Sequence, residues 1–350
     1  MPVVRSASGR PAGLVYNERH LYLTVSGPAH VAIEVEMIQR YWTVLGAALT
    51  LISALPVAAQ SPRTPDGRPD LQGVWTNATV TPLERPAELG NQQFFTKEQA
   101  ARYAKDVVDR NNSDRRDGPA EIDVGRAYNN FWREGGTKVI STLGTSLIVD
   151  PLDGRIPALT PEAQRRAAAR AEARLSHPAD GPEDRSLQER CILWPAAGPP
   201  MLPVGYNSNY QIVQGPGYVA IVVEMIHDVR RIPTDGSPHL PSNVRQWLGD
   251  PRGHWEGNTL VVDSTNFTDK TNFRGSGENL HLVERFTRTG PESLMYEFTV
   301  DDPASFAKPW SAQVPLTRST GPVLEYACNE GNYAMQGILG GARAAEKAKQ

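Results

Sequence analysis

Two scarcities in the 350-residue sequence narrow the classes of protein that it can encode. Only two cysteines occur, Cys191 and Cys328, and neither forms a CxxC pair or has a neighbouring histidine. Histidine spacings such as HxH and HExxH, which gather metal ligands, are also absent. A thiol redox site is therefore not indicated, and we expect no metal site.

The signatures of common cofactors and nucleophiles are missing too. No Gly-x-Gly-x-x-Gly, Walker or Gly-x-Ser-x-Gly pattern occurs, so neither a nucleotide cofactor nor a serine nucleophile is indicated. The formal charge is −3, from 36 basic and 39 acidic residues spread along the chain. Without a basic stripe to meet a phosphate backbone, we expect no nucleic-acid partner, and we expect no cofactor.

One apolar run near the N-terminus has the pattern of a secretory signal. After Met37, Arg40 supplies a positive charge, residues 42–55 form an apolar core, and small residues end at Ala59. We expect residues 37–59 to be a cleaved signal peptide, which makes the protein periplasmic or secreted, without stable membrane insertion. An uncleaved anchor is the alternative, but the run is short for the ~20 residues that span a bilayer.

The signal pattern divides the rest of the chain. Residues 1–36 stand upstream of it, where no targeting segment belongs, so we interpret them as a dispensable segment, with Met37 as a candidate start. Residues 60–72, rich in Pro, Gly and Asp, are interpreted as a linker. The sequence predicts a single β-rich domain over residues 73–335 and a C-terminal helix or tail over residues 336–350.

Signals for the start of a helix occur twice. Thr96, with a glutamine three residues later, has the pattern of a capping box and predicts a helix near residues 96–110. Thr160, followed by Pro161, predicts a second helix near residues 161–175. Both helices are expected at the periphery of the domain.

From Tyr206 onward the sequence becomes a series of short strand-like segments separated by turn residues. The last of them covers residues 323–330, and the alternation of residues 253–267 is interpreted along one strand. An earlier hairpin is predicted around a turn at residues 152–154. Because no helix lies between the late strands, the predicted fold is mainly β: an antiparallel β-barrel or sandwich with two or three peripheral helices.

The two cysteines lie in the part of the chain that is expected to be exported. In an oxidising compartment an isolated pair usually joins, so we expect a Cys191–Cys328 disulfide. Two buried free thiols are the alternative.

Several segments together resemble a large family of secreted bacterial proteins of unknown function. They include GHWEGNTLVVDSTNF, ENLHLVERFTR and LEYACNEGNY, and the likeness covers nearly the whole chain after the signal. The resemblance implies export and a shared fold, but no activity. Ser237 departs from the family pattern, which usually has arginine there. A weaker resemblance is to lipocalin-like barrels, whose first strand carries a Gly-x-Trp such as Gly73-Val74-Trp75.

The candidate catalytic residues are His254, Glu256 and Arg285. Residues two apart in a strand face the same side, so His254 and Glu256 can meet at one cavity. An imidazole beside a carboxylate is a general acid-base arrangement, and Arg285 is expected to stabilise an anion from a neighbouring strand. A rim ion pair is the alternative, and sequence alone favours it.

The candidate ligand-binding residues are aromatic and charged side chains of the strands. They are Trp75, Trp255, Trp310, Glu224, His227, His281 and Arg231. A buried Glu224 needs a compensating cation, and Arg231 or Arg285 is the expected partner.

Two hypotheses of function follow. In the first, the barrel is an exported binding protein that encloses an apolar or aromatic small molecule, with tryptophan walls and polar anchors. In the second, the same cavity is the site of a lyase or hydrolase that uses the His254–Glu256 pair. Whether the chain is an enzyme stays open, and the binding hypothesis is the first choice.

Overall fold

The computed structural model describes residues 13–17, 20–24, 62–116, 118–121, 130–271 and 273–349. The chain divides into two units, residues 1–60 and residues 61–350. In the first unit, β1 (Gly13–Asn17) and β2 (His20–Thr24) form an antiparallel hairpin. The predicted signal peptide, residues 37–59, lies outside the described residues.

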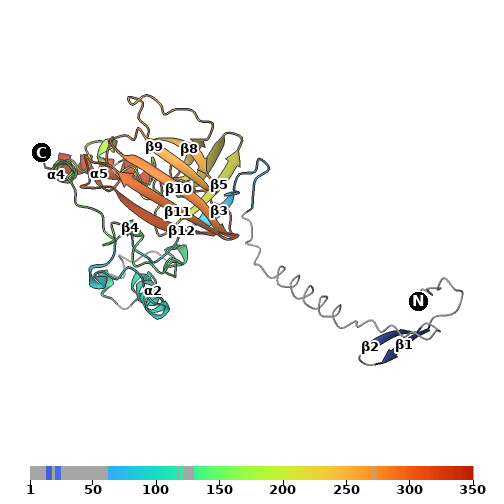
Figure 1. Ribbon diagram of the computed structural model, residues 1–350. Helices are drawn as coiled ribbons and strands as arrows, with labels where there is room; N and C mark the ends of the chain where they lie inside the picture. The colour runs from blue at the N-terminus through green and yellow to red at the C-terminus, as the bar shows by residue number, and fades with distance from the viewer. Residues whose placement is uncertain are drawn as a thin grey trace. The chain divides into compact units, whose positions relative to one another are not determined.

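The second unit is built on a nearly closed, barrel-like sheet (Figure 1). Its strands are β3 (Gly73–Thr76), β5 (Asn209–Gly215), β6 (Tyr218–Val223), β7 (Val229–Pro233), β8 (Asp250–Glu256), β9 (Thr259–Thr265), β10 (His281–Gly290), β11 (Ser293–Asp301) and β12 (Trp310–Arg318). They follow chain order around the barrel, and β3 pairs with β5 on one side and with β12 on the other. The predicted antiparallel β-barrel is thus confirmed.

One junction of the barrel, between β7 and β8, has no strand pairing among the described residues. The nine strands pair antiparallel at all eight of the remaining junctions, so β7 and β8 run in the same direction. Neighbours with this orientation need a long connection, and residues 234–249 supply it. The strands touch midway, because a Cβ on Gly253 would lie 2.9 Å from the side chains of Ile232 and Thr234. We call this junction the seam.

Aromatic side chains fill the barrel interior. Strands β10, β11 and β12 alternate buried and partly exposed residues, which places one side of each strand inside. Ring centroids lie 4.9 Å apart for Phe286 and Tyr296, and 5.7 Å apart for Phe298 and Trp310. Each fully buried aromatic side chain contributes about 1.5 to 3 kcal/mol by leaving water. The interior is therefore a packed core.

Three α-helices of the described residues lie outside the sheet (Figure 1). They are α2 (Lys97–Asn111), α4 (Pro161–Ser176) and α5 (Tyr333–Lys347). Thr96 and Gln99 form the predicted capping box, and Thr160 caps α4, so both predicted helix starts are confirmed. No helix in the described part of the chain is long and apolar enough to cross a membrane. Short 3-10 turns cover Ala87–Leu89, Asn130–Trp132, Pro182–Asp184, Met225–His227 and Phe273–Gly275.

Two predicted strand segments do not form as expected. Around residues 152–154 there is no hairpin: only β4 (Ile148–Asp150) is extended, and it pairs with β12. Pro151 follows it directly and has no N–H for a ladder. Residues 323–330 contain no strand either. The backbone N–H of Leu324 donates instead to a side chain, that of Glu224 at 2.8 Å.

Residues 253–267 form two strands rather than one. β8 ends at Glu256 and β9 begins at Thr259, with Gly257 in the turn at φ +58°. Glycine adopts this left-handed conformation without steric cost, so the chain reverses there. The interpretation of residues 253–267 along one strand is therefore wrong: His254 pairs with Val261 across the turn, so His254 and Leu260 lie on opposite faces of the sheet.

The predicted disulfide between Cys191 and Cys328 is present. Its Cα atoms are 5.6 Å apart, and 137 positions separate the two cysteines in the sequence. The bond ties the segment before β5 to the segment after β12, neither of which belongs to a strand. It thus fixes chain segments that backbone pairing does not hold.

Candidate functional site

A cavity of about 490 Å³ opens at one end of the seam. Residues 228–231, at and before the start of β7, form one side, and Pro251 of β8 forms the other. Residues 245–249 of the long connection border it. Its apolar lining comes from Ile192, Leu193, Trp247 and Leu248. We call this cavity the seam pocket, and it exists because two parallel strands part without backbone pairing.

A buried ion pair lies at the seam pocket. The side chains of Arg230 and Glu284 are 1% and 0% exposed, and two guanidinium nitrogens donate to the carboxylate, one of them at 3.0 Å. The Tyr296 hydroxyl donates to the same carboxylate at 2.8 Å. Burial acts to lower the pKa of Arg230, but the charge of Glu284 outweighs it and raises this pKa. The Nε–H of Arg230 has no partner among the described residues, so one buried donor is left at the cavity.

Asp228 gives the seam pocket a second ionisable group. Burial raises the pKa of its carboxyl to about 6, and the charge of His227 offsets this only in part. The carboxyl is therefore neutral in weak acid and charged at neutral pH. His227, a predicted ligand residue, is exposed, and its Nδ1 lies 2.8 Å from the carbonyl oxygen of Tyr326.

Two more arginines stand at the seam pocket. Arg231, the one predicted ligand-binding residue that lines it, is exposed, and its guanidinium carbon lies 5.5 Å from the centre of the Tyr218 ring. Arg245 donates to the carbonyl oxygen of Glu278 at 2.6 Å. Apolar walls with a few charged groups are the usual anatomy of a small-molecule site.

His239 fastens the long connection to the outside of the barrel. Its Nδ1 lies 3.1 Å from Asp250 and its Nε2 lies 3.1 Å from Asp263. His281, another predicted ligand residue, also contacts Asp263, at 2.9 Å. Sequence reasoning misses this cluster, because its members lie on separate segments with no motif spacing. The described residues hold no group of three or more His, Cys, Asp or Glu placed to bind a metal ion.

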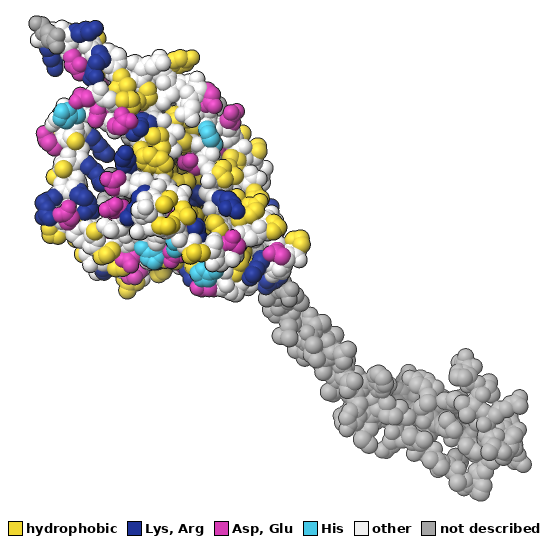
Figure 2. Space-filling model, turned by 90° about the horizontal axis from the view of Figure 1, so that it is seen from above, with side chains coloured by type: hydrophobic (Ala, Val, Ile, Leu, Met, Phe, Trp, Pro, Cys, Tyr) yellow, Lys and Arg dark blue, Asp and Glu magenta, His cyan; other side chains and the backbone are white. Residues whose placement is uncertain are grey.

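The three predicted catalytic residues do come together. His254 Nε2 lies 3.1 Å from Glu256 Oε1, and Arg285 donates to the same carboxylate at 2.7 Å. The hydrogen bond from Arg285 and then that from His254 lower the pKa of Glu256. The three side chains are 59%, 49% and 40% exposed, so water reaches them all. They belong to a surface on which charges of both signs are interspersed, as Figure 2 shows for one face.

The predicted tryptophans occupy different environments. Trp75 and Trp310 are fully buried and line none of the three cavities described here. Trp75 is a core residue, and the guanidinium groups of Arg288 and Arg318 lie over its ring at 5.3 and 5.6 Å from the ring centre. Trp255 lines a cavity of about 400 Å³, which also includes Thr234 at the end of β7.

Glu224 is buried, but the partner expected for a buried Glu224, Arg231 or Arg285, does not pair with it. Its carboxylate accepts hydrogen bonds from Asn209 Nδ2 at 2.7 Å and from the backbone N–H of Leu324 at 2.8 Å. Uncharged donors thus satisfy it, and it fixes the chain after β12 against the barrel.

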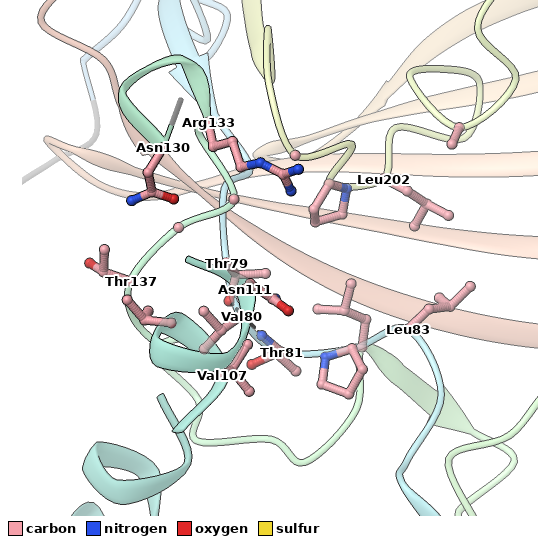
Figure 3. Close-up of a pocket in the computed structure, with 18 of the residues that line it drawn as sticks. Thr79, Val80, Thr81, Leu83, Val107, Asn111, Asn130, Arg133, Thr137 and Leu202 are labelled. Atoms are coloured by element: carbon pink, nitrogen blue, oxygen red, sulfur yellow. Dashed lines mark hydrogen bonds between the residues drawn. The ribbon is translucent and has the colours of Figure 1, made fainter. Parts of the chain in front are cut away.

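A third cavity, of about 420 Å³, lies beside α2 (Figure 3). Val107 of α2 and residues 79–83 form one side, and Leu202 lies across from them. Arg133 extends from a loop toward Leu202, over the space between the two sides (Figure 3). We call this cavity the basal cavity.

Comparison of the chain with protein-family models, with curated proteins and with solved structures finds no match. A barrel-like fold with cavities of several hundred Å³ is nevertheless an architecture that can bind small ligands.

Proposed function

We propose that the protein is an exported binding protein for an apolar or aromatic small molecule, which it holds in the seam pocket. The observation that carries this proposal is the cavity of about 490 Å³ at the unpaired junction of the barrel. Its volume lies in the range of small-molecule sites. Because aromatic side chains fill the barrel interior, the ligand enters at the seam rather than along the barrel axis.

The lining of the seam pocket suits such a ligand. Leu193, Trp247 and Leu248 provide apolar contact area, and the indole ring can stack on an aromatic ligand. Arg231 and Asp228 are the polar groups that would orient it. Apolar contact supplies most of the affinity, and these few charges supply specificity.

Export is the second part of the proposal. It is supported by the Cys191–Cys328 disulfide, because such bonds persist in oxidising compartments. The signal-like run at residues 37–59 and the resemblance to secreted bacterial proteins agree with it. A lipocalin-like role fits the order of the strands around the barrel, in which each strand neighbours the next in the chain.

The lyase or hydrolase hypothesis has a narrower basis. His254, Glu256 and Arg285 have the distances of an acid-base group, but they line none of the three cavities. Catalytic electrostatics gain strength where water is excluded, and these side chains are solvated. We therefore place binding ahead of catalysis.

The test is native mass spectrometry of the protein purified from its own host. We expect a retained small molecule, and we expect Leu248→Trp to displace it by filling the seam pocket. Val244→Trp, on the exposed part of the same connection, is the matched control and should keep the ligand. Purified protein without any ligand, together with no saturable binding of an aromatic probe such as anilinonaphthalene sulfonate, would refute the proposal.

A further inference from the structure

The basal cavity contains an unbalanced set of polar groups. Several polar residues in its lining have side chains without a hydrogen bond or ion pair to any described residue, among them Asn111, Asn130, Arg133 and Arg274. No aspartate or glutamate is among its described lining residues. Two guanidinium groups without a carboxylate partner among the described residues therefore border one cavity.

The nearest acidic neighbour in sequence does not neutralise them. The carboxylate of Glu134 accepts hydrogen bonds from the backbone N–H of Ser208 at 3.2 Å and from Asn209 Nδ2 at 3.4 Å. The carboxylate of Glu134 is therefore hydrogen-bonded to the residues at the start of β5. Arg133, one residue earlier, is exposed and lies over the cavity (Figure 3).

Arg274 is presented by a turn with an unusual backbone. Its φ of +52° lies in the left-handed region, which residues other than glycine rarely adopt. The preceding Phe273 is buried and stacks on Trp310, 6.2 Å between ring centroids, which anchors the turn. Strain of this kind is retained where the surrounding structure enforces it, and it concentrates at binding sites.

Apolar side chains form part of the remaining wall of the basal cavity. Val107, Leu83 and Leu202 line the cavity. The loop that carries Arg133 packs at Gly136 against the segment that follows β3, where a Cβ would lie 2.5 Å from the backbone nitrogen of Thr79. An inorganic anion would leave these apolar walls in contact with water, whereas an apolar tail would cover them.

We infer that the basal cavity binds a small amphipathic carboxylate, such as a medium-chain fatty acid or an aryl carboxylate. The carboxylate lies between Arg133 and Arg274, with Asn111 and Asn130 as additional donors. The apolar part lies against Val107 and its neighbours. This site is separate from the seam pocket and does not depend on the function proposed for that pocket.

The test is calorimetric titration of the full chain with octanoate, with 1-octanol as the uncharged ligand of the same length. We expect saturable octanoate binding that weakens with added salt, and octanol binding at least about tenfold weaker. Arg133→Gln and Arg274→Gln should each weaken octanoate binding about tenfold, and the double variant should abolish it.

Two controls locate the site. Arg102→Gln removes an exposed charge from α2 outside the cavity and should leave octanoate binding unchanged. Leu248→Trp in the seam pocket should also leave it unchanged. Equal binding of octanoate and octanol, octanoate binding that survives the double variant, or no octanoate binding at all would each overturn the inference.

Discussion

Arg230 and Glu284 face each other inside the barrel, from strands β7 and β10, with two guanidinium nitrogens on one carboxylate and almost no exposure to solvent. Their strands are not neighbours in the sheet, so the pair bridges the barrel interior. Burying two charges costs several kcal/mol per ion, and mutual attraction with hydrogen bonds only offsets that cost. The pair therefore favours the fold in which Arg230 and Glu284 meet, while it adds little to the net free energy of unfolding.

The first prediction concerns that pair. Glu284→Gln leaves the guanidinium of Arg230 buried without a counter-charge, so the free energy of unfolding should fall by about 3 to 5 kcal/mol. Replacing both residues, as Arg230→Met with Glu284→Leu, should restore most of it. Urea denaturation measures both. The exposed Glu256→Gln serves as the control and should change stability little, and a Glu284→Gln variant that matches it would contradict the account.

The second prediction concerns pH. The pKa of Asp228 is about 6 in the folded protein against an ordinary 3.8, so the folded state holds the proton more tightly. Stability should therefore fall as pH rises from about 4 to about 6 and then level off, by ~1–2 kcal/mol after discounting for partial exposure.

Asp228→Asn should remove this contribution. The measurement is the difference in urea midpoints between the two proteins across pH 4 to 8, because other carboxyls titrate in both. Asp106→Asn, on the exposed side of α2, should keep the original profile. A difference in urea midpoints that does not vary with pH would show that burial does not raise the pKa of Asp228.

The third prediction concerns the contact at the seam. Gly253→Val places methyl groups where Ile232 and Thr234 already lie within 2.9 Å of a Cβ position. We expect a loss of about 1 to 3 kcal/mol from overpacking, since strand β7 must move away. Gly277→Ala, at a position with nothing within 4 Å of the added carbon, is the control. Equal melting temperatures for the two variants would mean that the seam is open in solution.

The fourth prediction concerns the disulfide. Peptide mapping without reduction should recover Cys191 linked to Cys328, and the double Cys191→Ser, Cys328→Ser variant should lose about 2 to 5 kcal/mol of stability. Recovery of both residues as free thiols from the oxidised protein would contradict it. Far-ultraviolet circular dichroism should stay β-rich in the variant, because neither cysteine lies in a strand.

Local chemistry explains which elements the sequence predicts well. The caps at Thr96 and Thr160 act within one helical turn, so their residue types suffice to place both helix starts. Alternation within single strands is equally local. The strand predicted at residues 323–330 does not form for the opposite reason. The backbone N–H of Leu324 donates to Glu224, which lies a hundred positions away in the sequence.

The candidate sites depend on distant residues and are predicted only in part. His254 and Glu256 are two residues apart, and their contact is foreseeable. That Arg230 meets Glu284, or that His239 meets Asp263, depends on strand order and on the length of one connection. No spacing rule encodes either. The seam itself follows from an odd number of strands, which the sequence does not reveal.

The position of β3 sets the order in which the molecule can be completed. It pairs with β5 and with β12, so a chain that emerges N-terminal end first exposes Trp75 long before its second partner exists. Arg318, whose guanidinium lies over that indole ring, is also the last residue of the final strand. Pairings between such distant residues make folding slow. The barrel therefore closes only after nearly the whole polypeptide has been delivered, and until then its strands have unpaired edges that a chaperone can bind.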